Sequence, residues 1–217
     1  MNEIKADFFL FQEAKPTDEL FLQKDHMIWD EIGGTCKWGS GIYSPTNKLT
    51  KENIKTDFKG SIVIANSEVI SERLTLISMY GQMEGIGPTH GYAITNLHRM
   101  LSDLTGLFNG HLNGKRKIIL GGDLNASTQL DKTQGNNSHR IFFDRLTDFK
   151  LQDVFALSGN KDYVQTLRHN ISKVPWQNDY MFISISLSEK FLKYEIIDNE
   201  HVRKFSDHNI LIIEMDI

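Results

Sequence analysis

Apolar stretches of strand length recur from one end of this 217-residue chain to the other. Phe8–Phe11 is short and wholly apolar, as expected of a buried strand. Later stretches of strand character lie at residues 61–65, 73–80, 117–120, 180–183, 193–197 and 210–213. Asn66-Ser67-Glu68 has turn chemistry and predicts a hairpin between the stretches that flank it. The chain must therefore fold around β-sheet.

Two segments instead have helical spacing. From Thr95 onward, large apolar residues recur every three or four positions, and Asn109-Gly110 is expected to end this helix. Ser138 is a favourable N-cap for a second helix. The apolar face of that helix is expected to consist of Ile141, Phe142, Leu146 and Phe149. Because strands outnumber helices, the sequence predicts an α+β fold in which sheet packs on sheet with helices outside.

Composition narrows the class of protein. Hydrophobic residues make up 40% of the chain, and no linker or repeat divides it, so we expect a single domain over residues 1–217. No apolar run approaches the roughly 18 residues of a membrane span, and the N-terminus lacks a secretory signal pattern. The only cysteine, Cys36, excludes an intramolecular disulfide. We therefore expect a cytoplasmic protein without a membrane partner.

The net charge of −4 argues against a protein that coats nucleic acid by charge alone. It leaves open an enzyme that meets phosphate groups through a bound metal. The oligomeric state is open as well.

Polar residues cluster where apolar stretches end. Glu13 follows the first stretch, and Asp123 and Asn125 follow residues 117–120 after two glycines. A carboxylate just past a buried strand is held rigidly, at an edge where ligands collect. The alternative for Asp123 is an Asx-type turn, and the alternative for Glu13 is an ordinary solvated strand end.

Two further candidates lie near the C-terminus. Asp207 and His208 stand side by side before the last stretch, and together they offer a metal ligand and a proton carrier. Asp179 opens the stretch at residues 180–183 and could orient an imidazole. The plainer alternatives are a loop before an edge strand and the simple start of a strand.

In this order and with these flanks, the motifs resemble those of the endonuclease/exonuclease/phosphatase superfamily. That superfamily includes pancreatic-type deoxyribonucleases, class II AP endonucleases and inositol polyphosphate 5-phosphatases. The matching segments are Phe11-Gln12-Glu13, Ser78-Met79-Tyr80, Gly122-Asp123-Leu124-Asn125, Asn178-Asp179-Tyr180-Met181-Phe182 and Ser206-Asp207-His208. The resemblance implies a four-layer α/β/β/α sandwich of two mixed β-sheets flanked by helices.

The resemblance also implies Mg²⁺ or Mn²⁺ as cofactor and hydrolysis of phosphate esters. Glu13 would hold the metal, with Asp207 assisting directly or through water. Asp123 would orient and deprotonate the attacking water. Asn125 would fix both the phosphate and Asp123 by hydrogen bonds.

The remaining implied roles concern charge at the phosphate. His208 would donate a hydrogen bond to a phosphoryl oxygen, and Asp179 would keep that imidazole protonated and oriented. Tyr80 matches a position where AP-endonuclease-like members place a tyrosine against phosphate. Trp176 could stack on a base or sugar, although a position in the core or at its rim is an equal alternative.

One departure from the family pattern concerns the start of the chain. Most members begin with a strand whose asparagine helps to hold the metal, and about ten residues precede the Gln-Glu motif here. Either the sequence is a fragment or the protein is a trimmed member with weakened metal binding. A dimer that seals the edge left by a missing strand is a further expectation.

Three functions remain open at this point. The first is a Mg²⁺-dependent nuclease with a nucleic acid substrate, which Tyr80 and Trp176 favour. The second is a phosphatase acting on a small or lipid phosphate. The third is a catalytically impaired remnant of the fold that binds a partner.

Overall fold

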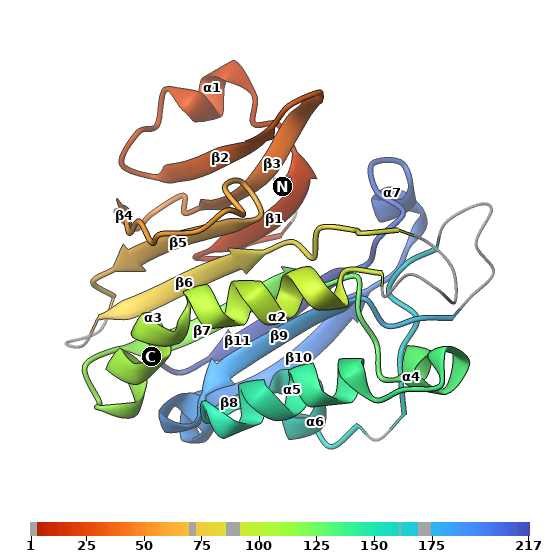
Figure 1. Cartoon of the computed structure of the whole chain (residues 1–217). Helices are drawn as coiled ribbons and strands as arrows, with labels where there is room; N and C mark the ends of the chain where they lie inside the picture. Colours follow the sequence, from red (N-terminus) through yellow and green to blue (C-terminus); the bar gives the residue numbers. More distant parts are fainter. Residues whose placement is uncertain (1–3, 70–72, 86–91, 161, 169–174) are drawn as a thin grey trace. The chain divides into compact units, whose positions relative to one another are not determined.

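A computed structural model describes residues 4–69, 73–85, 92–160, 162–168 and 175–217, and Figure 1 shows its helices and strands. The chain divides into two compact units, residues 1–80 with 99–122 and residues 81–98 with 123–217. The expectation of a single domain stays a prediction.

The first unit is built mainly of strands. Its elements are β1 (Phe9–Ala14), α1 (Asp18–Phe21), β2 (Met27–Gly33), β3 (Cys36–Tyr43), β4 (Thr50–Lys51), β5 (Ile62–Ser67), β6 (Leu74–Met79), α3 (Thr105–Leu112) and β7 (Lys117–Asp123). The last residue of β7, Asp123, belongs to the second unit, and α2 (Ile94–Asp103) contributes residues to both.

Two sheets pack against each other in the first unit. The strands β1, β3 and β2 form an antiparallel sheet with β3 in the middle. In the other sheet, β4, β5 and β6 pair antiparallel and β7 pairs parallel to β6, so this sheet is mixed. Residues of β3 and β1 contact β5 and β6, and all of β6 is buried. The predicted packing of sheet on sheet is confirmed within this unit.

The expected hairpin is present as the antiparallel pair β5 and β6, in which Ile62 opposes Met79. The strand β5 extends further than expected, because Asn66 and Ser67 belong to it rather than to the turn, whereas β6 is shorter than the expected stretch at residues 73–80. The side chain of Asn66 donates to Glu52 at 2.7 Å and accepts from Thr75 at 2.8 Å. These bonds satisfy the amide within the strand. The connection includes residues 70–72, which lie outside the described residues.

The first predicted helix is interrupted, but at a different residue. Helix α2 ends at Asp103 and α3 begins at Thr105, whereas Asn109-Gly110 lies inside α3. The expected break at Asn109-Gly110 is therefore wrong. Leu107 and Phe108 are buried, and the packing of these side chains outweighs the poor helix propensity of Asn and Gly.

The second unit combines helices with two pairs of strands. Its elements are α4 (Gln129–Gln134), α5 (Ser138–Asp148), β8 (Leu151–Asp153), α6 (Val154–Leu157), β9 (Asp179–Ser184), the 3₁₀ helix η1 (Ile185–Lys190), β10 (Phe191–Ile197), α7 (Glu200–Arg203) and β11 (Ile210–Met215). The pair β8 and β9 and the pair β10 and β11 are both antiparallel.

Aromatic side chains hold α5 against β9. The ring of Phe143 lies 4.8 Å from that of Tyr180 and 6.3 Å from that of Phe182. The other face of this layer meets the second strand pair, because β9 contacts β11. Figure 1 shows α5 in front of these strands. The second unit is thus layered as helix, sheet and sheet.

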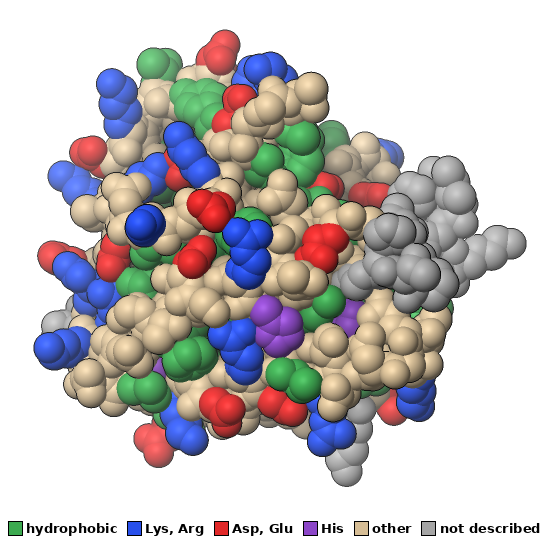
Figure 2. Space-filling model, viewed as in Figure 1, with side chains coloured by type: hydrophobic (Ala, Val, Ile, Leu, Met, Phe, Trp, Pro, Cys, Tyr) green, Lys and Arg blue, Asp and Glu red, His purple; other side chains and the backbone are tan. Residues whose placement is uncertain are grey.

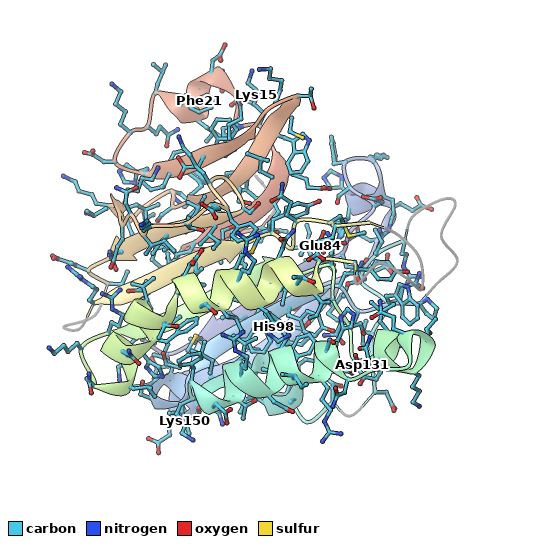
Figure 3. All side chains as sticks on the ribbon, viewed as in Figure 1. Lys15, Phe21, Glu84, His98, Asp131 and Lys150 are labelled. Atoms are coloured by element: carbon cyan, nitrogen blue, oxygen red, sulfur yellow. The ribbon has the colours of Figure 1, made fainter. Side chains whose placement is uncertain are left out.

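The start of α5 differs from the sequence prediction. The N-cap residue is Asn137, not Ser138, and Ile141 is 43% exposed rather than part of the apolar face. The free N–H groups of the first turn are satisfied from α4, where Asp131 accepts from His139 at 3.0 Å and from Arg140 at 2.9 Å (Figure 3). A distant carboxylate has replaced the local serine cap, which no pattern near Ser138 indicates.

His98 links α2 to α5 within the second unit (Figure 3). Its Nδ1 accepts from the guanidinium of Arg145 at 2.9 Å, and its ring packs edge-on against Phe142. These contacts give His98 a structural role.

Each strand expected above is present, and the structure has further strands, among them β2, β4 and β8. The structure is α+β, with layered sheets, one of them mixed, and helices flanking them. None of the helices in the described residues is both long enough and apolar enough to cross a bilayer.

Gly122 allows a tight approach of β7 to its neighbours in the first unit. Its φ is +151°, and a Cβ there would lie 2.1 Å from the carbonyl oxygen of Met79. We expect Gly122→Ala to lower the free energy of unfolding by more than about 3 kcal/mol, measured by urea denaturation. The control is Gly114→Ala, which has a φ of +70° and open space around a Cβ and should cost only about 1–2 kcal/mol. Equal losses would contradict this view of Gly122.

Asp153 caps α6 by accepting the N–H of Phe155 at 2.9 Å. Burial raises the pKa of Asp153 to about 6 from an ordinary 3.8, although hydrogen bonds from two backbone N–H groups oppose the shift. Between pH 4 and 6 the folded state therefore binds more protons than the unfolded state, and this carboxyl makes stability fall as pH rises.

Asparagine caps helices as well as aspartate does, without the buried charge. We expect Asp153→Asn to raise the free energy of unfolding by about 1–3 kcal/mol above pH 6, and to bring no gain below about pH 4. Urea denaturation across this pH range tests the prediction, with the exposed Asp144→Asn as control. A gain that does not depend on pH would exclude the proposed cause.

Candidate active site

Strand ends in the second unit bring three predicted residues together. Asp123 closes β7, Asp179 opens β9, and His208 precedes β11. Backbone bonds align these segments, because Leu124 N–H donates to the carbonyl of Asn178 at 2.8 Å. The backbone of His208 pairs antiparallel with that of Leu167 in a single β-bridge. Residues far apart in the sequence thus meet in one place.

Asp123 forms the Asx turn that was its alternative interpretation. Its Oδ1 accepts the N–H of Asn125 at 2.9 Å, and its Oδ2 accepts from the side-chain amide of the same residue at 3.1 Å. Asn125 has a φ of +46°, a left-handed conformation that asparagine tolerates better than most residues. The amide of Asn125 also donates to the carbonyl of Gly81 at 3.1 Å. The turn therefore fixes the orientation of a buried carboxylate.

His208 and Asp179 form a charged pair. The imidazole Nδ1 donates to both carboxylate oxygens of Asp179, at 3.1 and 2.9 Å. On the other side of the ring, Nε2 lies 3.9 Å from Oδ2 of Asp123. That distance is too long for a direct hydrogen bond. An oxygen atom placed beside both groups could bond to each of them.

The surroundings of His208 favour its charged form. Burial lowers the pKa of this imidazole, but the hydrogen bond and charge of Asp179 outweigh burial. The carboxylates of Asp123 and Asp207 add to the effect, and the pKa of His208 is raised to about 9. The imidazole is therefore an imidazolium at neutral pH.

Asp123, Asp179 and His208 offer ligand atoms within 4.8 Å of one another, so this cluster could hold a metal ion. An imidazole binds a metal only through a deprotonated nitrogen, and the raised pKa of His208 favours the form in which both ring nitrogens carry a proton. Hard cations such as Mg²⁺ also prefer oxygen ligands. The carboxylate of Asp123 fits such an ion well, and the imidazole of His208 fits it poorly.

Asp207 has an exposed side chain on a fixed backbone. Its carbonyl accepts from the guanidinium of Arg203 at 2.8 Å and from the N–H of Arg168 at 2.7 Å. Both arginines also bind the carboxylate of Asp198, each at 2.6 Å. These bonds hold the loop before β11, so the carboxylate of Asp207 points to solvent from a fixed position.

Thr166 connects the segments of the pair and was not predicted from the sequence. Its buried hydroxyl accepts the N–H groups of Asn178 and Asp179, at 2.9 and 3.1 Å. Its carbonyl accepts from Asn209 N–H at 2.8 Å. Trp176, a half-buried residue, accepts the N–H of Thr166 through its carbonyl at 3.2 Å. The stacking role of Trp176 stays a prediction.

The first unit brings together Glu13 and Tyr80. The phenol of Tyr80 donates to Oε1 of Glu13 at 2.6 Å, and the ring meets Trp38 edge-on at 5.3 Å. Glu13 is exposed, and its φ is +50°. It lies where the pairing of β1 with β3 shifts register between Phe11 and Ala14. Such a bulge turns a side chain out of the regular alternation of a strand.

The neighbour of Glu13 anchors the bulge. Gln12 donates through its amide to the hydroxyl of Ser78 at 2.8 Å, and Ser78 donates to the carbonyl of Phe11 at 3.1 Å. The two residues of the Gln-Glu motif thus differ locally. Gln12 anchors the strand by hydrogen bonds, and the carboxylate of Glu13 is exposed.

Comparison with solved structures reveals the fold. An AP endonuclease from Archaeoglobus fulgidus aligns with a TM-score of 0.72 and 16% identity, over 100% of this chain and 91% of that protein. The AP endonuclease LMAP from Leishmania major aligns with a TM-score of 0.75 and 17% identity, over 99% and 80%. The chain has the fold of the endonuclease/exonuclease/phosphatase superfamily.

A third solved structure with this fold is a variant of the 3′ phosphatase NExo from Neisseria, bound to a product DNA hairpin. It aligns with a TM-score of 0.67 and 15% identity, over 97% of this chain and 89% of that one. The sequence itself matches no protein-family model and no curated protein. The expected fold class of the superfamily is confirmed.

The role of Thr166 in this endonuclease/exonuclease/phosphatase fold is open to a direct test. Thr166→Val keeps the shape of the side chain but leaves two buried backbone N–H groups without their acceptor. We expect the free energy of unfolding to fall by about 2–4 kcal/mol, measured by urea denaturation. Thr166→Ser keeps the hydroxyl, so its free energy of unfolding should fall much less. If the serine and valine variants were equally stable, the hydroxyl would have no such role.

Proposed function

We propose that this protein is a metal-dependent phosphoesterase that hydrolyses phosphodiester bonds in nucleic acid. The observation that carries the proposal is the arrangement of His208 between the buried Asp123 and Asp179, with Nε2 of the imidazole 3.9 Å from a carboxylate oxygen of Asp123. A carboxylate can accept a proton from water, and an imidazolium can donate to a phosphoryl oxygen. The fold shared with two AP endonucleases supports the choice of a nucleic acid substrate.

The proposed roles follow from the hydrogen bonds of each residue. Asp123 orients the attacking water and accepts its proton. Asn125 holds Asp123 in place through both carboxylate oxygens, and its proposed contact with the phosphate requires its amide to leave the carbonyl of Gly81. His208 donates to a phosphoryl oxygen as negative charge grows, and Asp179 orients the imidazole through Nδ1.

Glu13 and Asp207 are the proposed metal ligands, with Mg²⁺ or Mn²⁺ as the ion. Both carboxylates are exposed and both are held on constrained backbone, which suits oxygen ligands for a hard cation. Such an ion, when bound, neutralises phosphate charge during hydrolysis. Tyr80 orients Glu13 through its hydrogen bond and is a proposed phosphate contact.

Charge alone does not explain the proposed nucleic acid partner. The net charge is −4, and on the face shown in Figure 2 lysine and arginine side chains are interspersed with acidic ones. Binding would therefore depend on contacts at the site rather than on a general cationic field.

A second candidate function is removal of a terminal phosphate from nucleic acid. The neighbour named as a 3′ phosphatase bound to a DNA hairpin favours this alternative. The same residues would serve, because a phosphomonoester also needs a positioned water and stabilised charge.

One experiment separates the candidates. The protein is incubated with plasmid, an abasic-site oligonucleotide, a 3′-phosphorylated oligonucleotide, single-stranded RNA and inositol phosphates, with Mg²⁺ and then with EDTA. We expect metal-dependent strand cleavage that EDTA abolishes. Release of orthophosphate without strand cleavage would favour a phosphatase. No turnover of any substrate would favour a binding remnant of the fold.

Single substitutions test the assigned residues. Asp123→Asn, Glu13→Gln and His208→Ala are each expected to lower turnover by at least about a hundredfold at saturating Mg²⁺. The control is Asp57→Asn, which removes an exposed carboxylate paired only at the surface with Arg99. Circular dichroism checks that each variant is folded. Near-full activity of folded His208→Ala would show that the role of this residue is wrongly assigned.

A further inference from the structure

Phe205 is a large apolar side chain that the second unit leaves in water. It is 80% exposed and stands three residues before His208 in the sequence. Three residues of fully extended chain span at most about 11 Å, so the two Cα atoms are no farther apart than that. An exposed aromatic residue therefore lies within about 11 Å of the proposed catalytic histidine, measured between Cα atoms.

The ring projects from a rigid turn. The N–H groups of Phe205 and Ser206 both donate to the carbonyl of Val202, each at 3.0 Å. The ring of His201 lies 5.4 Å from that of Phe205 and supports one side of it. A turn whose backbone is already ordered loses little conformational freedom when a ligand covers it.

Arg203 ties the same turn to the residues on both sides. Its guanidinium donates to Asp198 at 2.6 Å, to the carbonyl of Asp207 at 2.8 Å and to the side chain of Asn209. Arg168 binds the same carboxylate of Asp198. Two guanidinium groups thus lie in the same part of the fold as Phe205, and guanidinium groups are good hydrogen-bond donors to phosphate.

We propose that Phe205 is a stacking platform for an unpaired nucleobase that flanks the scissile phosphodiester. This inference rests on the proposed function and adds a choice of substrate to it. Every nucleobase has a face that can stack on an aromatic ring, so such a contact tolerates any sequence. In a duplex the faces of the bases are already stacked on each other. Phe205 therefore favours strands whose bases are single-stranded, flipped or frayed.

A protein partner is the competing occupant. A stable protein interface covers a broad patch, whereas the observation here is one ring beside arginine residues. The combination of an isolated exposed ring with adjacent guanidinium groups fits nucleic acid better, since aromatic and cationic groups alternate in single-strand sites.

The test compares two substrates and several side chains at one position. Phe205→Ala should lower kcat/KM for a single-stranded DNA oligonucleotide by roughly 10- to 100-fold, mainly through KM. Hydrolysis of a dialkyl phosphodiester, which has no aromatic ring to stack, should be unchanged. Phe205→Trp should restore activity on the oligonucleotide, and Phe205→Leu should not, because leucine is apolar but has no π face.

Leu192→Ala is the matched control. Leu192 is also in the second unit, is 60% exposed and lies on β10 away from the proposed catalytic residues. This substitution should leave the rate of hydrolysis of both substrates unchanged. If Phe205→Ala and Leu192→Ala had equal activity on the oligonucleotide, the inference would be overturned. It would also be overturned if Phe205→Leu matched the wild type, or if Phe205→Ala changed only the oligomeric state seen by size exclusion.

A second experiment removes the nucleobase that is proposed to stack on Phe205. Replacing the base next to the cleaved bond by an abasic spacer should lower kcat/KM of the wild type. The factor should equal the one that Phe205→Ala causes on the unmodified oligonucleotide. The same replacement should have little further effect on Phe205→Ala itself. Additive losses would overturn the inference.

Failure of the proposed function gives a different result from failure of this inference. If the wild type hydrolyses neither substrate, the proposed function is wrong, and fluorescence anisotropy with a labelled oligothymidylate decides the role of Phe205. A loss of affinity of about 10- to 100-fold in Phe205→Ala, restored in Phe205→Trp, supports the inference. Equal binding by all variants, or no binding by the wild type, overturns it.

Discussion

The second unit depends on the neutralisation of two buried carboxylates. Asp123 is 5% exposed and Asp179 is 8% exposed, and both approach the same imidazole. Two like charges in such a place repel each other, and each has lost most of its hydration. A cation close to both acids reduces this repulsion. The imidazolium of His208 lies 2.9 Å from a carboxylate oxygen of Asp179 and 3.9 Å from one of Asp123, so it is placed to do this.

Other residues of the second unit hold Asp123, Asp179 and His208 in these positions. Thr166 fixes the backbone at Asp179, Arg203 fixes the loop that carries His208, and Asn125 fixes the carboxylate of Asp123. None of these three residues has to touch a substrate in order to matter. Their hydrogen bonds restrict Asp123, Asp179 and His208 to one geometry, which is the condition for preorganised charge stabilisation.

The sequence predicted the strands and the acids at their ends because both follow from local pattern. Apolar runs of strand length are visible directly, and a carboxylate beside them is easily noticed. Thr166 and Arg203 were missed because they lie in segments without a repeating pattern, and their partners are distant in sequence. The prediction of the α5 cap was wrong for a similar reason, since Asp131 accepts from the first turn of the helix in place of the local cap expected at Ser138. Tertiary hydrogen bonds of this kind leave no periodic signal.

Backbone conformation adds an argument that the sequence could not supply. Among the described residues other than glycine, only Glu13, Tyr92, Asn125 and Lys150 have positive φ. Lys150 follows the end of α5, where a left-handed residue is ordinary. Glu13 sits in a strand irregularity and Asn125 in a turn after a strand, and both carry groups with proposed roles. Strain of this kind persists only where surrounding bonds enforce it. Those bonds come from Gln12 at one position and from Asp123 at the other, so the motif residues maintain the unusual backbone that presents their neighbours.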